Sequence, residues 1–130
     1  MPALPVNSVW CGDAFFFASD LVEALGEVRR VLRPGGRVVM TVCMSLDDQP
    51  SAHPLDWRPL LRHVGLRPLR QQETPHDREH ATAMYAAWIA HEAELRAELP
   101  DRAVDELLDE ARSVGGRLAR MRRVLVVAEH

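Results

Sequence analysis

Hydrophobic positions in the first 43 residues change from a strand pattern to a helix pattern and back. The short apolar run Val9-Trp10-Cys11 is bounded by polar turn residues, and this predicts a buried strand. Four apolar residues then repeat at helical spacing on one face: Leu21, Leu25, Val28 and Leu32. The segment Arg37–Cys43 is almost continuously apolar and β-branched, as in a strand buried on both faces. The order strand, helix, strand predicts a βαβ unit with parallel strands and a right-handed crossover.

The boundaries of the first helix are marked by residues suited to them. Asp20 is a good N-cap, and Glu23 three residues later completes a capping box. The segment Arg33-Pro34-Gly35-Gly36 ends the helix, because proline blocks its continuation and glycine supplies the positive φ of a tight turn. Ala14–Ala18 between the strand and the helix is expected to be an apolar loop or a helical turn.

A second, shorter helix and a third strand follow a polar loop at Ser45–Pro54. Asp56 is expected to cap a helix that runs to Val64 and ends at Gly65. Leu66–Glu73 is the candidate for the third strand. Pro68 within it predicts a place at the edge of the sheet, because proline cannot donate a hydrogen bond to a neighbouring strand.

The last third of the chain predicts two long helices and a final strand. Thr74-Pro75 begins a helix that is expected to run to Leu99, broken by Pro100. Its expected inner face consists of Met84, Trp88, Leu95 and Leu99. Arg102–Val114 predicts the next helix, ended by Gly115-Gly116, with Val104, Leu107, Leu108 and Ala111 pointing inward. Arg122–Ala128 is the fourth strand, and its basic entry (Arg117, Arg120, Arg122 and Arg123) is interpreted as a solvated surface.

Composition indicates an ordinary globular protein. With 130 residues we expect one domain, 1–130, made of a core at 1–73, a helical insertion at 74–121 and a final strand at 122–130. The net charge of −3 disfavours nucleic-acid binding. Cys11 and Cys43 lie in apolar runs and are interpreted as small buried thiols. No signal peptide and no apolar run near the ~20 residues of a membrane span are recognised, so a cytoplasmic location is expected.

Two segments resemble a known family. Leu4–Leu25 and Glu27–Val42, which contains Leu32-Arg33-Pro34-Gly35-Gly36 before an apolar strand, resemble the fourth strand, next helix and fifth strand of class I S-adenosylmethionine (SAM)-dependent methyltransferases, particularly the small-molecule branch. The terminal strand fits as well. The resemblance implies an α/β fold with a partial Rossmann-like sheet of about four strands. It also implies that the last strand is antiparallel and inserts between Arg37–Cys43 and Leu66–Glu73.

The resemblance covers only the C-terminal half of that family. The family binds SAM through a glycine-rich loop after its first strand, where small residues let the backbone approach the ligand. None of the seven glycines here forms a Gly-x-Gly loop between a strand and a helix. SAM is therefore the cofactor that the resemblance implies, with most of its site expected to be missing from this chain.

The candidate site follows the first strand, because ligands of this fold lie beyond the carboxyl ends of the strands. By resemblance, Cys11, Gly12 and Phe16 would face the cofactor. Asp13 is the candidate catalytic base, or instead a cap of the following turn. Candidate substrate contacts are Phe17, Tyr85 and Trp88, and each of these, like Phe15 and Phe16, could instead belong to the core.

A metal site is not expected, although one motif suggests it. His76-x-x-Glu79-His80 matches the pattern of inverted zinc peptidases. His76, however, lies in the first turn of its helix, and His91 is roughly 16 Å beyond His80 along the helix axis, too far to be a third ligand.

Three functions remain open from the sequence. The chain could be a half-enzyme that methylates a small molecule once another chain completes the SAM site. It could be a non-catalytic remnant that acts as a protein-binding or regulatory subunit, or a small-ligand binder without methyl chemistry. In each case the strand Val9–Gly12 becomes an exposed sheet edge, so we expect a homodimer or a partner chain across it.

Overall fold

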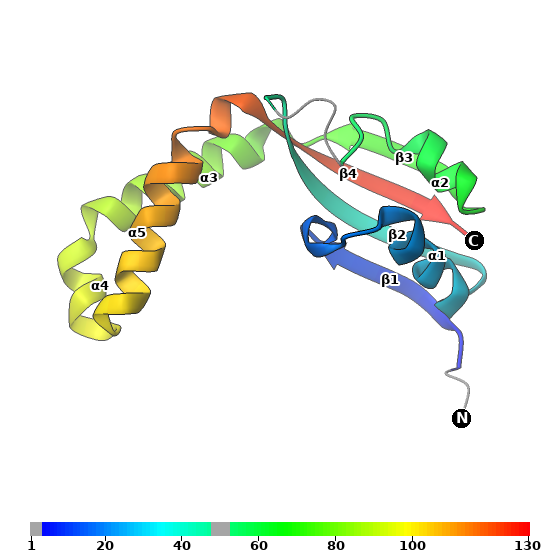
Figure 1. Ribbon diagram of the computed structural model, residues 1–130, viewed down its shortest axis with the longest axis horizontal. Helices are drawn as coiled ribbons and strands as arrows, with labels where there is room; N and C mark the ends of the chain where they lie inside the picture. Colours follow the sequence, from blue (N-terminus) through cyan, green and yellow to red (C-terminus); the bar gives the residue numbers. More distant parts are fainter. Residues whose placement is uncertain (1–3, 48–52) are drawn as a thin grey trace. The chain divides into compact units, whose positions relative to one another are not determined.

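The computed structural model describes residues 4–47 and 53–130, which include a four-stranded sheet (Figure 1). Its strands are β1 (Val6–Gly12), β2 (Leu32–Ser45), β3 (Arg67–Glu73) and β4 (Met121–Glu129). They are ordered β1-β2-β4-β3, with β1 parallel to β2 and β4 antiparallel to β3. This arrangement confirms the partial Rossmann-like sheet, the inserted last strand and the edge position of the strand that contains Pro68.

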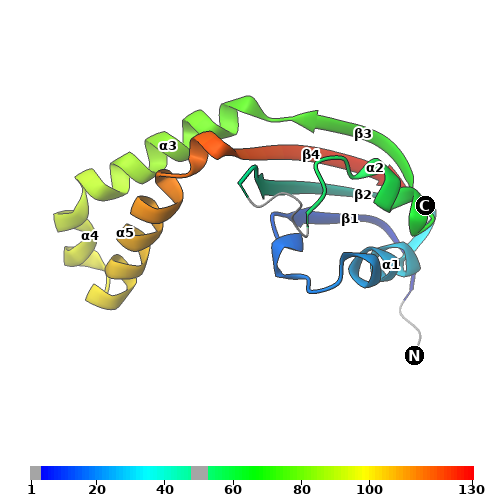
Figure 2. The same ribbon diagram turned by 45° about the horizontal axis from the view of Figure 1, so that its top comes forward.

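The sheet carries its helices on one face. After β1 come a 3-10 turn, η1 (Phe15–Phe17), and α1 (Leu21–Val31), and α2 (Arg58–His63) precedes β3. A single apolar cluster joins Leu25 of α1 and Leu61 of α2 to Val38, Met40 and Val42 of β2 and to Val124, Val126 and Ala128 of β4. Figure 2 shows α1 and α2 beside this sheet. The buried residues of β2 alternate along the strand, so one face of β2 makes the core.

The opposite face of the sheet is only half-buried, and this corrects two sequence expectations. Val39, Thr41 and Cys43 of β2 are half-buried, so β2 is not buried on both faces. The expected buried strand β1 is an edge strand, and its Trp10 is 81% exposed. No helix in the part of this unit that the structure describes joins the core from that side. The continuous apolar run of β2 predicted burial on both faces. In the structure, buried and half-buried residues alternate along the strand instead.

The Pro-Gly-Gly segment becomes part of β2 instead of a separate turn. β2 begins at Leu32, five residues before the predicted start. Gly35 adopts a positive φ of 78° and its N–H donates to His130 O (2.8 Å), while His130 N–H donates to Gly36 O (2.9 Å). The β1–β2 register shifts between Val6 and Ser8 at the same place. Hydrogen bonding with the end of β4 thus extends β2 through the two glycines, and the pairing of β2 is irregular at this point.

The helices α1 and α2 of the sheet unit begin close to the predicted positions. The Asp20 carboxylate accepts a hydrogen bond from Glu23 N–H (3.0 Å), which confirms the N-cap. α2 begins at Arg58, two residues after the predicted cap, and Asp56 accepts from Arg58 N–H (3.0 Å) just before it. Gly65 has a φ of 84° and ends this helix as predicted. The expected polar loop at Ser45–Pro54 lies partly outside the described residues.

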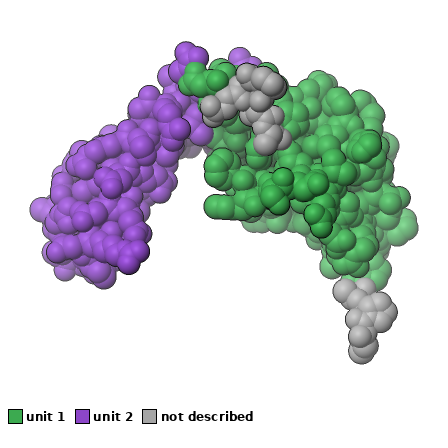
Figure 3. All heavy atoms as spheres, in the orientation of Figure 1, with its two compact units in different colours: residues 1–73, 123–130 green, residues 74–122 purple. Residues whose placement is uncertain are grey.

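The chain divides into two compact units, coloured separately in Figure 3. Residues 1–73 and 123–130 form the sheet unit, and residues 74–122 form a helical unit. The helical unit contains α3 (Pro75–Ala90), α4 (Glu92–Glu98), α5 (Asp101–Gly115) and a 3-10 turn, η2 (Leu118–Arg120).

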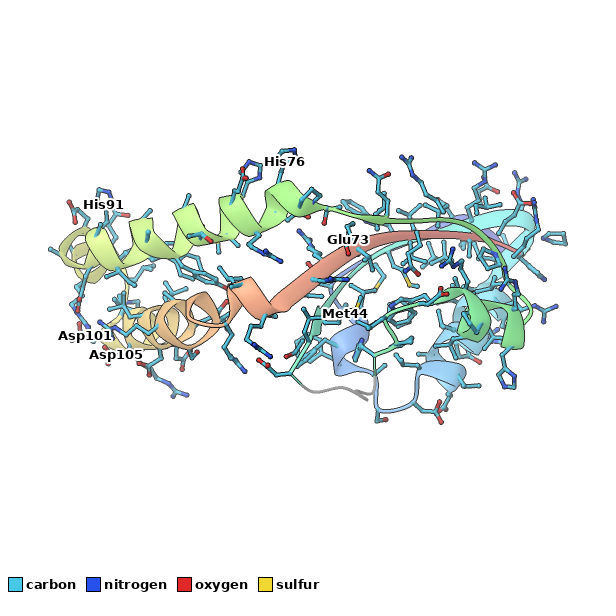
Figure 4. The ribbon with its side chains drawn as sticks, turned by 90° about the horizontal axis from the view of Figure 1, so that it is seen from above. Met44, Glu73, His76, His91, Asp101 and Asp105 are labelled. Carbon is cyan, nitrogen blue, oxygen red and sulfur yellow. The ribbon has the colours of Figure 1, made fainter. Side chains whose placement is uncertain are left out.

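The predicted single helix from Thr74 to Leu99 is wrong, because it breaks at His91 (φ −106°, ψ 29°) into α3 and α4. The break accompanies an ion-pair network in which Arg96 of α4 contacts Glu92, Asp101 and Asp105. Asp101 and Asp105 lie together at the α4–α5 end of the unit (Figure 4). The contacts of Arg96 with Asp101 and Asp105 join α4 to the start of α5.

The inner face predicted for α3 and α4 differs from the structure, whereas that predicted for α5 does not. Tyr85 is the buried residue of α3, whereas Met84 and Leu99 are exposed. Trp88 and Leu95 are half-buried. On α5, Val104, Leu108 and Ala111 are buried and Leu107 is half-buried, so the predicted inner face of this helix is confirmed.

Candidate functional site

The turn after β1 is tied to the end of β2. Parallel pairing places Gly12 opposite Thr41, so the two strands reach the same edge of the sheet. The next residue, Asp13, has a φ of 51°, in the left-handed region. Its N–H donates to both the backbone oxygen (3.0 Å) and the side-chain Oγ1 (3.2 Å) of Thr41. Backbone hydrogen bonding therefore continues one residue beyond the strand and fixes the start of the turn.

The carboxylate of Asp13 forms an ion pair with Arg123 of β4. Arg123 Nε donates to Oδ1 of Asp13 (3.2 Å), and Nη2 donates to Oδ2. Arg123 Nη2 also lies 3.4 Å from Thr41 Oγ1. The predicted alternative, in which Asp13 caps the turn, is wrong, since the residue in the cap position of η1 is Ala14 and has no side-chain hydrogen bond. The assignment of Asp13 as a catalytic base stays a prediction.

The two cysteines lie near the carboxyl ends of β1 and β2. Cys11 is half-buried and packs against the core cluster. Burial raises the pKa of the Cys43 thiol, and the negative charge of Asp13 raises this pKa further, while Arg123 and a hydrogen bond to Met44 act in the opposite direction. Cys43 therefore stays a neutral thiol near neutral pH.

The three consecutive phenylalanines after the turn have different environments. Phe15 is buried and meets Trp57 edge-on, with ring centroids 6.2 Å apart, so it belongs to the core. Phe16 and Phe17 are 71% and 84% exposed and contact each other edge-on at 5.7 Å. Phe16 also stacks on His53 at 6.1 Å. Phe16 and Phe17 thus offer an aromatic surface beyond the end of β1.

Sequence reasoning missed two residues of this site, Arg123 and His53. Arg123 was grouped with solvated basic residues, and it meets Asp13 only because β4 inserts beside β2. His53 is buried, in a region read as polar loop, and its ring lies 5.9 Å from that of Trp57. No local spacing signal marks either residue.

Tyr85 and Trp88 lie in the helical unit and contact each other there. Their rings meet edge-on at 5.2 Å, and Tyr85 Oη donates to the carboxylate of Glu110 on α5 (3.0 Å). Tyr85 therefore packs between α3 and α5, which is the core role that the sequence left open for it. Trp88 is half-buried. The assignment of both residues to substrate binding stays a prediction.

The histidines of the zinc-like motif lie on an exposed helix surface. His76 Nδ1 is 3.6 Å from the carboxylate of Glu79, and both side chains are exposed. Figure 4 shows His76 and His91 toward opposite ends of α3. Across residues 4–47 and 53–130, no three side chains of the metal-binding types gather closely enough to hold an ion. Within the same ranges, no helix has the length and apolar character needed to cross a lipid bilayer.

Comparison with known proteins identifies a methyltransferase fold. Residues 4–40 match the sequence profile of a family described as a methyltransferase domain. No curated protein matches the chain. The chain has the partial fold of a class I SAM-dependent methyltransferase, as the sequence resemblance implied.

Three solved structures illustrate this similarity. Phosphoethanolamine N-methyltransferase 2 from Haemonchus contortus, in complex with SAM, has a TM-score of 0.77 at 16% identity; the match covers 95% of this chain and 33% of that one. A candidate sarcosine dimethylglycine methyltransferase from Galdieria sulphuraria has a TM-score of 0.77 at 21% identity, covering 99% and 55%. The cyclopropane synthase MmaA2 from Mycobacterium tuberculosis has a TM-score of 0.75 at 14% identity, covering 98% and 56%. The chain thus spans between one third and just over half the length of these proteins.

Proposed function

We propose that this chain forms one wall of a SAM-dependent methyltransferase site and takes part in methyl transfer to a small molecule. The observation that carries this proposal is the profile match at residues 4–40, which spans β1, the following turn and the beginning of β2. Solved proteins of the same fold are described in complex with SAM or S-adenosylhomocysteine. The match therefore includes the strand end where ligands of open α/β sheets bind.

The residues of this wall have distinct proposed roles. Cys11 and Gly12 bring the backbone of β1 to the cofactor, and the exposed ring of Phe16 packs against it. The exposed ring of Phe17 is assigned to the substrate. Because the methyl group of SAM is already activated, the reaction chiefly requires alignment of donor and acceptor. Asp13, held by Arg123, would orient the acceptor.

A second polypeptide segment is proposed to complete the cofactor site. β1 is a terminal strand of the sheet, and Leu4, Val6 and Trp10 beside its outer edge are exposed. An exposed apolar edge strand is a template for pairing with another chain. We place a segment that carries the glycine-rich loop, which the seven glycines of this sequence do not form, on this edge.

A non-catalytic role is the second candidate, and the ion pair of Asp13 favours it. Both oxygens of this carboxylate accept hydrogen bonds from Arg123, so the one ionisable candidate base is engaged within the protein. A regulatory subunit that retains the fold for protein binding would use the same β1 edge without methyl chemistry.

Isothermal titration with SAM tests the proposal. The chain is titrated alone and together with a polypeptide that carries the glycine-rich loop of a methyltransferase, and methyl transfer is followed with labelled SAM. Micromolar binding by the pair, with weak or no binding by the chain alone, supports the proposal. Absence of binding in both titrations contradicts it, and micromolar binding by the chain alone contradicts the need for a second segment.

Matched edge variants locate the contact. Trp10→Lys on β1 should abolish binding by the pair, because it places a charge within the proposed interface. Leu69→Lys changes an exposed residue of β3, the other edge strand, and should leave binding unchanged. Equal effects of the two variants would contradict pairing across β1.

A further inference from the structure

Arg123 joins three segments that are remote in sequence. It lies at the start of β4, and its guanidinium crosses toward the far end of β1, where it contacts Asp13, and donates toward Thr41 on the intervening strand. Arg123 and Asp13 are separated by 110 positions in the chain. A planar guanidinium that donates through two nitrogens to both carboxylate oxygens fixes orientation as well as distance.

The backbone at Asp13 needs such support. Asp13 has a φ of 51°, in the left-handed region that residues other than glycine adopt less readily than ordinary conformations. Backbone of this kind persists only where its surroundings over-determine it. Here the surroundings are the two acceptors on Thr41, which hold the N–H of Asp13, and Arg123, which holds its carboxylate. The side chain and the main chain of one residue are thus anchored to different strands.

We propose that Arg123 is a positioning residue that holds the Asp13–Phe17 turn, and with it Phe16 and Phe17, at the carboxyl end of β1. The turn itself contains further backbone hydrogen bonds from Phe17 N–H to Ala14 O and from Ala18 N–H to Phe15 O. The rings of Phe16 and Phe17 are mostly exposed, whereas Phe15 of the same turn is buried in the core and Phe16 stacks on His53. The identity of the ligand that this turn faces rests on the proposed function, whereas the positioning itself does not.

An ordinary surface ion pair is the competing explanation for this contact, and such pairs contribute little. Two features distinguish the pair. Its side chains are only 35% and 42% exposed, and both engaged nitrogens of Arg123 donate to the same carboxylate. In addition, Asp13 is the residue of the turn with a left-handed backbone, so loss of the ion pair should change the conformation or mobility of the main chain there.

Hydrogen exchange of the full chain without SAM tests the proposal. In Arg123→Gln, the amides of Asp13, Phe17 and Ala18 should exchange at least about tenfold faster than in the unsubstituted chain. The amide of Ala24, which donates to Asp20 O in α1, should be unchanged and reports that the sheet unit is folded. Arg37→Gln is the matched control, because Arg37 also makes an ion pair between strands, with Glu129, away from this turn. Unchanged exchange of the three amides in folded Arg123→Gln, or equal acceleration in the control, would overturn the proposal.

A double-mutant cycle separates positioning from general loosening. Asp13→Asn keeps the size of the side chain and removes its charge, so it should accelerate the same amides without unfolding the chain. The double variant Asp13→Asn/Arg123→Gln should exchange no faster than Arg123→Gln alone, because both changes act through one ion pair. Additive acceleration would mean independent structural effects and would overturn the proposal. Since no step uses SAM, failure of SAM binding leaves this result readable.

Discussion

At the scale of single residues, Gly36 and Gly26 differ in the space available for a side chain. A Cβ at Gly36 would lie 2.8 Å from the backbone oxygen of Arg33 and 3.1 Å from that of Asn7. These atoms belong to backbone and cannot move aside as a flexible side chain would. Gly36 therefore allows the close approach of β1 and β2 at the irregular start of their pairing. Gly26, within α1, has no atom within 4 Å of such a Cβ.

Alanine substitutions at these glycines should change stability in opposite directions. Gly36→Ala should lower the free energy of unfolding by about 1–3 kcal/mol, the usual cost of forcing extra volume into a packed region. Gly26→Ala should raise it by about 0.5–1 kcal/mol, because glycine weakens a helix interior. Urea denaturation followed by circular dichroism measures both. A Gly36→Ala variant as stable as Gly26→Ala would show that the strands can separate at this point without cost.

Local residue chemistry was predictable where its partners are near in sequence. The Asp20 cap and the terminating Gly65 follow from spacings of a few residues, and both are present. The Asp13–Arg123 pair depends on the order of strands in the sheet, so no local pattern could indicate it. Likewise, three identical phenylalanines gave no means to decide which ring is buried, because the 3-10 geometry of η1 decides it.

At the scale of elements, Glu129 joins three strands at one place on the sheet. Its carboxylate lies on β4, accepts from Arg37 Nε of β2 (3.3 Å) and contacts Arg67 of β3. Hydrogen bonding by Arg67, and then by Arg37, lowers the pKa of Glu129 below its usual value. A lowered pKa in the folded state means that the charged form stabilises the sheet. This stability is present above the ordinary glutamate pKa of about 4.3 and is lost as the pH falls through the lower, folded-state pKa.

Glu129→Gln should therefore remove an acid-sensitive part of the stability. The urea midpoint of the variant should lie below that of the unsubstituted chain at pH 7, and the gap should shrink as the pH falls below about 4.3. Glu27→Gln is the control, because Glu27 pairs only with Arg30 one turn away in α1, and exposed pairs of this kind contribute little. A gap that stays constant down to low pH would assign the effect of Glu129→Gln to something other than its charge.

Element types were predicted more securely than element ends. Every expected strand is present, and three of the four are marked in the sequence by runs of apolar residues. β2 begins at Leu32 and not at the predicted Arg37, because Gly35 and Gly36 form backbone hydrogen bonds with His130 after the end of β4. The break at His91 was invisible in the sequence, since it accompanies contacts between Arg96 and acids of the next helix.

At the scale of the whole molecule, the chain consists of two units with separate cores. The resemblance implied the order of the strands correctly, because that order belongs to the fold as a whole. The half-exposed face of the sheet was not predicted. A run of apolar residues predicts that a strand is covered on both faces, but it does not identify the element that would cover each face. Trp10 illustrates this, since its apolar run suggested burial and its edge position leaves it exposed.

Separate cores predict separate responses to a core substitution in the helical unit. Tyr85 is buried there, meets Trp88 at 5.2 Å and donates a hydrogen bond to Glu110. Tyr85→Ala removes the ring and should destabilise this unit by about 3 kcal/mol, as other aromatic-to-alanine changes in cores do. Amide exchange should then accelerate throughout α3 and α5. The amides of β2 should keep their protection, because Val38, Met40 and Val42 belong to the core of the sheet unit.

Tyr85→Phe is the matched variant for this experiment, because it keeps the ring and loses the hydrogen bond to Glu110. It should cost about 1 kcal/mol, since the carboxylate of Glu110 is exposed and water can replace the lost donor. The same amides of α3 and α5 should respond, only less strongly. If β2 loses protection in parallel with α3 in Tyr85→Ala, the two units unfold as one cooperative body, and the helical unit cannot then open while the sheet stays intact.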